Sequence, residues 1–268
     1  MLKSPAERLT DLLLAVLAAV TLTVLYAPVL ISALFSVVPY DQAGLHWQAA
    51  GFDWYRALPG NASVMAAVRA SALVGVLSVA AATVLAVVMA LYVEWQGAIG
   101  RRFIEIVVYL PFLMPPIVTG LSLLIFLDRL GLSRGLATVV IGHTALVLAV
   151  LYRLVLTRLR ALPKSLVEAS ADLGATRLQT FRHVVWPQLR SAVATGALLA
   201  LTVSFDETLV TVFLAGDATT LPLRLWGMMR VGFTPEINAL VTVVLAASIG
   251  LAVVVALRLK PDSRGEDQ

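Results

Sequence analysis

Long apolar runs, each free of Asp, Glu, Lys and Arg, divide this chain into segments. Five of these runs cover residues 12–40, 70–93, 106–127, 135–152 and 237–257. Each is near or above the roughly 18–20 residues that an α-helix needs to cross about 30 Å of hydrocarbon. A sixth run, 191–205, is shorter, but apolar sequence resumes after Asp206 and Glu207 and reaches residue 216. The pattern therefore predicts six membrane-spanning helices.

The fold class that follows is an all-α integral membrane protein. Of its residues, 60% are hydrophobic and 13% are charged, whereas soluble domains carry about 25% charged residues. A single transmembrane domain over residues 1–268 is expected. Its spans are placed at about 12–38, 66–93, 106–127, 136–156, 190–215 and 238–258.

Basic residues predict the orientation of these spans. Most Lys and Arg residues fall at the amino end, between the second and third spans, between the fourth and fifth, and in the tail. The largest group runs from Arg153 to Arg190. The positive-inside rule then places both termini in the cytoplasm. The positive charge marks cytoplasmic loops, so membrane lipid is expected as a partner and nucleic acid is not.

A polar segment interrupts the apolar pattern between the fourth and fifth spans. It belongs to a connecting loop over residues 157–189, and its central part reads SLVEASADLGATRLQTFRHVVWP from residue 165. Ser165 and Glu168 have the spacing of a capping box, in which each side chain bonds the other residue's backbone N–H. Gly174 follows where a helix end favours a left-handed residue. The pattern predicts a short helix that ends at this glycine.

A second short helix is predicted after the glycine. Thr176 and Gln179 form a second capping box, and Pro187 can occupy the first turn of the following span but cannot continue a preceding helix. The segment is therefore predicted to contain two short helices joined by a glycine corner, which enter the fifth span at a proline.

Both short helices present apolar residues that need a cover. Leu166, Ala169 and Leu173 share one face of the first, and Leu178 and Phe181 share one face of the second. Helices this short are not stable alone in water. The cover is either the membrane surface or a groove on a soluble partner, and periodicity favours neither.

The same segment carries a family resemblance. Glu168-Ala169-Ser170, then Gly174, then Val184-x-Trp186-Pro187 resembles the EAA loop of permease subunits in type I binding-protein-dependent ABC importers, with matching spacing throughout. The departures are Ser170 for Ala, Val184 for Ile and Trp186 for Leu. The resemblance implies the MetI-like permease fold of six transmembrane helices with a cytoplasmic coupling helix pair.

Further strings resemble the polyamine (spermidine/putrescine) branch of that family, at the position of its second permease subunit. They extend over most of the chain and comprise residues 52–56, 110–120, 141–144, 204–207, 221–223 and 235–240. The expected function is a permease that forms half of a translocation pathway for small cationic amines. The expected location is a bacterial inner membrane, with several passes.

The resemblance also implies which residues couple transport to ATP hydrolysis. Expected partners are an ATP-binding subunit dimer, a second permease subunit of different sequence and an extracytoplasmic solute-binding protein. The chain has no Gly-x-x-x-x-Gly-Lys-Ser/Thr phosphate loop, so we expect no bound ATP, no cofactor and no catalytic residues. The ATPase-coupling residues expected are Glu168, Ala169, Ser170, Leu173, Gly174, Phe181 and Pro187.

Two carboxylates within the fifth span are the next candidates. Charges inside a span are costly and usually face protein or a water-filled path. Asp206 and Glu207 are therefore candidates for the translocation pathway, and the alternative is a pair at the membrane interface or a salt bridge to Arg224 or Arg230. His143 is expected to be a packed or capping residue, and no metal site is predicted.

Three alternative functions stay open at this point. The first is the same machine with another solute, such as thiamine, iron or an anion. The second is a stand-alone secondary transporter or channel, which the absence of a visible inverted repeat and the asymmetric fourth-to-fifth loop disfavour. The third is an intramembrane enzyme, which the absence of HExxH and Gly-x-Ser-x-Gly motifs and of paired catalytic aspartates disfavours.

Overall fold

The computed structural model describes residues 5–41, 44–94, 98–231 and 234–258, and these ranges are almost entirely helical. The chain forms two compact units. One is continuous from Ser63 to Trp226, and the other combines the residues up to Ala62 with those from Gly227 onward. The all-α prediction is confirmed, apart from one pair of two-residue strands within the described ranges. The single-domain organisation over 1–268 stays a prediction.

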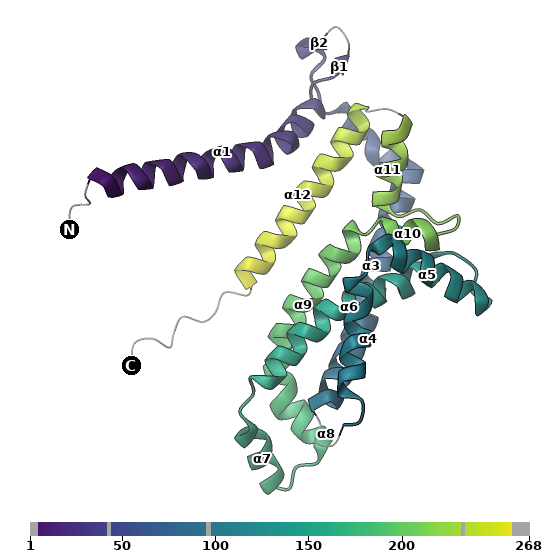
Figure 1. Cartoon of the computed structure of the whole chain (residues 1–268). Helices are drawn as coiled ribbons and strands as arrows, with labels where there is room; N and C mark the ends of the chain where they lie inside the picture. Colours follow the sequence, from purple (N-terminus) through teal and green to yellow (C-terminus); the bar gives the residue numbers. More distant parts are fainter. Residues whose placement is uncertain (1–4, 42–43, 95–97, 232–233, 259–268) are drawn as a thin grey trace. The chain divides into compact units, whose positions relative to one another are not determined.

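The continuous unit contains most of the helices (Figure 1). They are α3 (Ala62–Glu94), α4 (Arg101–Leu113), α5 (Pro116–Arg129), α6 (Leu136–Arg160), α7 (Lys164–Asp172), α8 (Arg177–Thr180), the π-helical turn η3 (Phe181–Val185), α9 (Trp186–Asp206), α10 (Leu209–Leu214) and the first half of α11 (Leu221–Val231).

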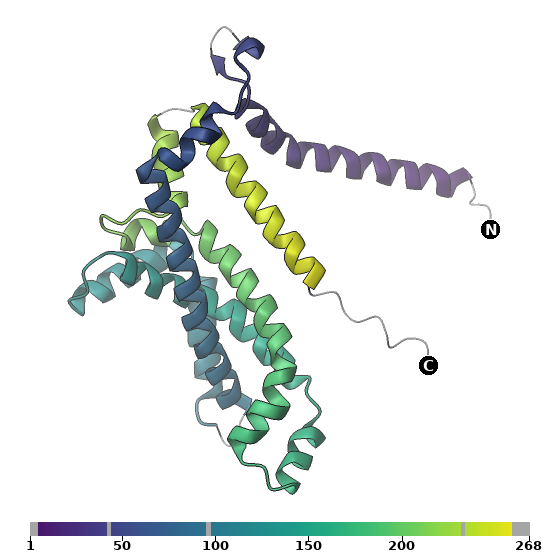
Figure 2. The same ribbon diagram turned by 180° about the vertical axis from the view of Figure 1, so that it is seen from behind.

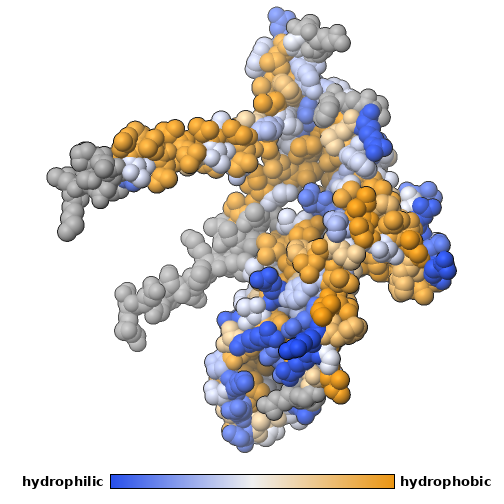
Figure 3. Space-filling view, in the orientation of Figure 1, coloured by the Kyte–Doolittle hydropathy of each residue, from blue (hydrophilic) through white to orange (hydrophobic). Residues whose placement is uncertain are grey.

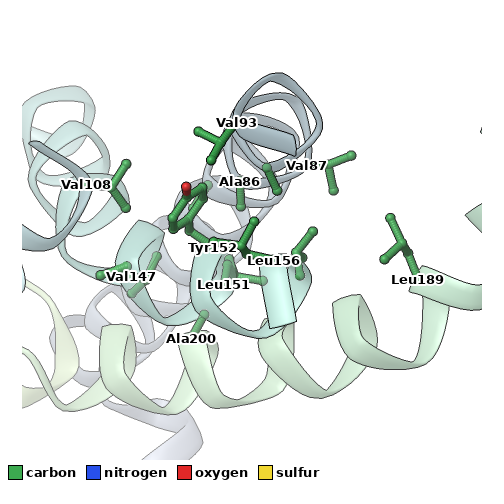
Figure 4. Close-up of a cluster of buried hydrophobic side chains, with 14 of the residues drawn as sticks. Ala86, Val87, Val93, Val108, Val147, Leu151, Tyr152, Leu156, Leu189 and Ala200 are labelled. Atoms are coloured by element: carbon green, nitrogen blue, oxygen red, sulfur yellow. The ribbon is translucent and has the colours of Figure 1, made fainter. Parts of the chain in front are cut away.

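The main core of this unit lies between α3, α4, α6 and α9 (Figure 4). Ala82, Ala86 and Ala90 recur on one face of α3 and are fully buried. Small side chains at this spacing let helix backbones approach closely, which is the usual way that helices associate in a membrane. Tyr109 of α4 meets Tyr152 of α6 edge to face, with ring centroids 5.9 Å apart. The core thus combines close helix packing with one aromatic pair.

The third predicted span is a pair of helices bent by 113° between α4 and α5. Pro115 has no backbone N–H, so the carbonyl of Pro111 lacks its usual helical donor. The hydroxyl of Thr119 donates to that carbonyl instead, at 3.3 Å. The bend therefore has a chemical cause, and a side chain replaces the lost backbone bond.

The short helix α10 packs closely against α5 and α6 at two glycines. A Cβ on Gly142 of α6 would lie 2.5 Å from Leu214 and 2.9 Å from Val210. A Cβ on Gly120 of α5 would lie 2.8 Å from Phe213. A side chain at either position would force these neighbouring side chains to shift, so the two glycines form a close seat for α10.

The second unit contains the chain's amino-terminal and carboxy-terminal helices. A hydroxyl of Ser32 donates to Asn238 Oδ1 at 3.2 Å, which joins α1 to α12, and Asn61 Nδ2 donates to Glu236 Oε1 at 2.7 Å. Its elements are α1 (Pro5–Phe35), β1 (Tyr40–Asp41), β2 (Gly44–Leu45), η1 (Trp47–Ala49), α2 (Asp53–Ala57), η2 (Leu58–Gly60) and α12 (Pro235–Arg258).

Several of these helices have the length and composition of membrane spans. Four described segments qualify alone, and the bent α4–α5 pair makes a fifth if it is one span. They are Leu9–Phe35, Ala62–Glu94, Leu136–Arg160 and Arg177–Asp206. The surface of α1 is apolar along nearly its whole length (Figure 3), and its apolar window buries no side chain, so it needs lipid or another subunit as a cover. The total of six spans stays a prediction.

The glycine seat beneath α10 gives a stability prediction. We expect Gly142→Ala to lower the apparent melting temperature of the purified protein by about 5 °C, because the added methyl group overpacks against Leu214 and Val210. Thermal unfolding in detergent measures this. Gly227→Ala is the control, since its Cβ meets no atom within 4 Å; equal melting temperatures for the two variants would contradict the seat.

Candidate functional site

The polar segment between α6 and α9 forms a loop with two helical arms at one end of the continuous unit (Figures 1 and 2). The first arm, α7, begins after Pro163 and not at Ser165. The capping box predicted for Ser165 and Glu168 is therefore wrong: no side chain caps α7, and Ser165 lies inside its first turn. Pro163 has no N–H and fixes an extended approach, so the helix can begin directly behind it.

Gly174 ends the first arm as predicted. Its φ is +77°, in the left-handed region. The amide of Gly174 donates to the carbonyl of Ala171 at 2.8 Å, and the amide of Ala175 donates to that of Ser170 at 3.1 Å. This pair of bonds is the Schellman arrangement, which satisfies the last carbonyls of a helix. The corner therefore has a defined, hydrogen-bonded backbone geometry.

The second arm begins at the capping box predicted at Thr176 and Gln179, which is confirmed. The amide of Thr176 donates to Gln179 Oε1 at 2.7 Å, and the amide of Gln179 donates back to Thr176 Oγ1 at 3.4 Å. The arm is not a separate short helix, however. It continues through the π turn η3 into α9, so that one helix runs from Arg177 to Asp206.

The π turn explains how the second arm passes Pro187 without a break. A proline ring clashes with the carbonyl four residues earlier in an α-helix. Here the amide of Trp186 donates to Phe181, five residues back, and this wider turn makes room for the ring. Pro187 then lies in the first turn of α9. Sequence analysis placed Pro187 correctly but predicted an interruption that the structure does not have.

The two arms are tied together by a pair of hydroxyl groups. Ser170 on α7 is buried, and its hydroxyl donates to the carbonyl of Val167 at 2.8 Å. Its oxygen lies 2.9 Å from Thr180 Oγ1 at the end of α8. Because Ser170 has already given its one proton, Thr180 is the donor in this second bond. Ser170 therefore joins the arms, whereas the alanine of the family pattern could not.

The other predicted coupling residues differ in their exposure. Glu168 and Ala169 lie on the surface of α7. Leu173, at the end of that arm, is 89% exposed, and Leu178 on the second arm is 74% exposed. Phe181 instead packs against the core of the unit, with its ring centroid 6.1 Å from that of Trp186. The exposed leucines need a cover, and Phe181 anchors the loop to the helices behind it.

Two arginines at the end of α6 join the loop to the surrounding helices. Arg158 donates from Nε and Nη2 to the backbone and side-chain oxygens of Gln188, both at 3.1 Å. Arg160 bridges Glu94 of α3 at 2.7 Å and Glu105 of α4 at 3.4 Å. Four helices are thereby fixed to one another where the loop begins.

At the far end of α9, the helix breaks beside the two carboxylates. Residues 190–215 were predicted as one span, but α9 ends at Asp206 and α10 starts at Leu209. Glu207 has an extended backbone, and its carboxylate accepts from the amide of Val210 at 2.9 Å. The break is therefore stabilised by the side chain of one of the two predicted residues.

Asp206 and Glu207 have different surroundings. Asp206 is exposed and Glu207 is half-buried. In the part of the chain that the structure describes, no ion pair joins either carboxylate to Arg224, one of the two alternatives considered above. The Asp206 carboxylate is thus available to a ligand, whereas Glu207 is occupied with capping.

His143 is buried and fully hydrogen-bonded. Its Nδ1 lies 2.8 Å from Ser204 Oγ and its Nε2 lies 2.9 Å from Thr211 Oγ1. Within the described ranges, no group of three His, Asp or Glu side chains is placed to hold a metal ion. His143 therefore belongs to a hydroxyl network at the α9–α10 break.

A cavity of about 370 Å³ lies elsewhere in the continuous unit. Its lining includes one acidic residue, Asp217, and one basic residue, Arg224. The lining residues are Ser63, Ala66, Ala67, Ala70, Leu136, Asp217, Ala218, Thr219 and Arg224.

Sequence reasoning missed the contacts that Thr180 and Arg158 make to hold the loop in place. Thr180 was detectable only as a polar residue among the apolar positions of the second arm. Arg158 was read solely as a charge that sets orientation. Both act through residues 10 and 30 positions away in sequence, and helical periodicity does not report contacts at such distances.

Comparison with known proteins identifies relatives that match most of the chain. The family described as "Binding-protein-dependent transport system inner membrane component" matches residues 82–259. The putrescine transport system permease protein PotI of Escherichia coli is 34% identical over 238 residues, which cover 84% of this chain and 83% of the relative. The spermidine/putrescine transport system permease protein PotC of the same organism is 29% identical over 242 residues, or 90% and 91% of the two chains.

Solved structures show the same fold. A chain of a bacterial ABC transporter involved in the import of the acidic polysaccharide alginate superposes with a TM-score of 0.75 at 17% identity, over 97% of this chain and 99% of that one. A chain of the MetNI methionine ABC transporter superposes with a TM-score of 0.59 at 19% identity, over 73% and 92%. At these identities the likeness concerns the fold alone.

The bond between the two arms gives a prediction for local stability. We expect Thr180→Val to raise the rate of tryptic cleavage at Arg177 about fivefold, because loss of this part-buried hydrogen bond favours local opening. Gel analysis of the digested native protein measures the rate. Thr202→Val is the control, since that hydroxyl donates only to Leu198 within its own helix; an equal effect of both variants would contradict the tie between the arms.

Proposed function

Since this chain belongs to the family of binding-protein-dependent transport system inner membrane components, we propose that its solute is a small polyamine of the putrescine and spermidine class. The chain is a permease subunit of an ABC importer and not an enzyme, and ATP hydrolysis occurs in a separate subunit. The observation that carries the solute assignment is similarity to two polyamine permeases over 84% and 90% of this chain.

The chemistry of the α9–α10 break supports a cationic solute. Asp206 offers an exposed carboxylate at the end of a long apolar helix. In a region of low polarity, a carboxylate attracts an ammonium group more strongly than it would in bulk water. Polyamines carry two or more ammonium groups, so Asp206 is one contact along their path. Glu207 contributes mainly by fixing the backbone of the break.

The two-armed loop is the part that binds the ATPase. Its exposed leucines, Leu173 and Leu178, supply the apolar anchors, and a groove on a soluble subunit covers them. Glu168 and Ala169 lie on the same arm surface. Because the second arm is one helix with α9, a displacement of the loop passes directly to the α9–α10 break.

The remaining assembly follows the family. We assign to this chain an ATP-binding subunit dimer, a second permease subunit of different sequence and an extracytoplasmic solute-binding protein as partners. The chain crosses the bacterial inner membrane six times as a single domain over residues 1–268, with both termini in the cytoplasm. The basic loop around α7 and α8 then lies on the cytoplasmic side, where the positive-inside rule expects it.

Uptake by the complete importer tests the solute assignment. Proteoliposomes that contain this chain with its ATPase, partner permease and binding protein are supplied with radiolabelled putrescine and with ATP inside. ATP-dependent accumulation that unlabelled spermidine competes with, and thiamine, ferric iron and sulfate do not, supports the proposal. Competition by one of those other solutes alone would assign the importer to that solute instead.

The glycine corner gives a prediction for coupling. No atom lies within 4 Å of a Cβ on Gly174, so only its φ of +77° opposes substitution. Gly174→Val costs about 1–2 kcal/mol in that conformation, and we expect uptake per ATP hydrolysed to fall about fivefold or more. Gly174→Asn is the matched variant, since asparagine tolerates the left-handed region. Normal coupling in the valine variant would count against the loop as the ATPase contact.

The two carboxylates give a separate prediction. We expect Asp206→Asn to raise the solute concentration needed for half-maximal uptake about tenfold, because a charged contact is lost. Glu207→Gln has a smaller effect, since an amide oxygen can still accept from Val210. Asp217→Asn is the control, an exposed carboxylate outside the break. If Asp206→Asn transports like the unmodified protein, Asp206 has no role in the pathway.

A further inference from the structure

The structure assigns His143 the role of a positioning residue that holds the break between α9 and α10 and so places Asp206. This inference rests on the proposed function of Asp206, and its physical part can be tested without any solute. The helix that carries His143 is α6, which packs against both α9 and α10. One side chain of a neighbouring helix therefore reaches both sides of the break.

The hydrogen bonds around His143 form one consistent set of donors and acceptors. Thr211 Oγ1 donates its single proton to the carbonyl of Glu207 at 2.8 Å, because a carbonyl can only accept. Thr211 can then only accept from His143, so Nε2 carries the imidazole proton and donates at 2.9 Å. Nδ1 of a neutral ring is an acceptor, and Ser204 donates to it at 2.8 Å. A single tautomer satisfies every bond.

These bonds connect three successive parts of the chain. Ser204 lies in the last turn of α9, and Thr211 lies in the first turn of α10. Through Thr211 the network reaches the backbone of Glu207, the residue at the break itself. The helical backbone is interrupted between Asp206 and Leu209. Two hydrogen bonds of the imidazole thus connect the end of α9 to the start of α10 across this interruption.

The rest of α10 is held by contacts that surround this network. Gly142, the neighbour of His143, forms the seat against which Val210 packs. At the other end of α10, the carbonyl of Leu214 accepts from the amide of Gly135 at 2.9 Å. Both ends of α10 are therefore fixed to the first half of α6, and His143 bonds to residues on both sides of the break.

Loss of the imidazole has a local consequence. Without it, Ser204 and Thr211 lose their shared partner, and the start of α10 is free to move away from α6. Asp206, which is exposed and makes no ion pair to Arg224 in the described part of the chain, then loses its fixed position relative to α6. Each solute molecule that binds would then have to fix the position of the Asp206 carboxylate.

Cysteine labelling tests whether His143 holds the break. The natural chain has no cysteine. Labelling of one introduced cysteine can therefore be measured on this chain by mass spectrometry. Val210→Cys reports on the break and Ala86→Cys on the core, since both side chains are fully buried. The complete importer is reconstituted in phosphatidylethanolamine–phosphatidylglycerol vesicles and treated with N-ethylmaleimide, which needs a hydrated thiolate.

We expect His143→Leu to accelerate labelling at Val210→Cys about tenfold, because two buried hydrogen bonds are lost, with no change at Ala86→Cys. His143→Gln retains a donor and an acceptor and restores most of the protection. Thr144→Val is the matched control, because that buried hydroxyl donates only to Val140 within α6. Unchanged labelling at Val210→Cys, or equal acceleration at both reporters, would overturn the role of His143.

Milder variants keep the test decisive if His143→Leu does not assemble. Ser204→Ala and Thr211→Val each remove one partner of the imidazole, and each should accelerate labelling at Val210→Cys about threefold. Protection equal to that of the unmodified protein in both variants would overturn the inference.

Uptake measurements then test the link to Asp206. If His143 acts by placing that carboxylate, His143→Leu adds no further loss to Asp206→Asn, whereas a general structural defect gives additive losses. If Asp206→Asn alone is silent, the pathway role of Asp206 fails, and the labelling result still decides whether His143 holds the break.

Discussion

The structure depends on one constraint, which is that each backbone N–H and C=O inside a bilayer must find a partner within the protein. Long helices satisfy this requirement without help. The interruptions do not, and at two of them the sequence supplies a specific replacement. Thr119 donates to the carbonyl that Pro115 leaves unpaired, and the carboxylate of Glu207 accepts the amide of Val210 after α9 ends. The breaks are therefore built features with defined geometry.

Close helix packing follows from the same apolar environment. Lipid tails are as apolar as leucine, so helices gain little from apolar burial alone and rely on contact at short range. The alanines of α3 at positions 82, 86 and 90, and the glycines at 120 and 142, provide surfaces without projecting side chains. As a result, α10 lies close enough to α6 for His143 to reach Thr211.

The continuous helix from Arg177 to Asp206 connects the two-armed loop to the α9–α10 break. Its 30 residues correspond to about 45 Å at 1.5 Å per residue. One end carries the second arm of the two-armed loop, and the other end carries Asp206. The π turn at Phe181–Val185 keeps this helix unbroken at Pro187. In the proposed function, this continuous helix transmits movement of the loop to the α9–α10 break, and the hydroxyl pair of Ser170 and Thr180 joins the first arm to it.

The two-armed loop shows how far local chemistry predicts local structure. The left-handed corner at Gly174 and the capping box of Thr176 and Gln179 were predictable, because both depend on residues within six positions of each other. The capping box at Ser165 was predicted wrongly, because Pro163 begins the helix earlier and leaves Ser165 inside its first turn. Competing local signals of similar strength cannot be ranked without the backbone path.

The all-α membrane fold and the corner and second arm of the loop could be predicted from the residues alone, because hydrophobic run length and capping spacing are local properties. Charges within an apolar run are also local, and they made Asp206 and Glu207 candidates for the pathway. The structure was needed to show that the helix through Pro187 is continuous, that Ser170 meets Thr180, and that His143 bridges Ser204 and Thr211. These contacts join residues 10 to 68 positions apart. Their partners are set by how the helices pack, and no local pattern of residues encodes that packing.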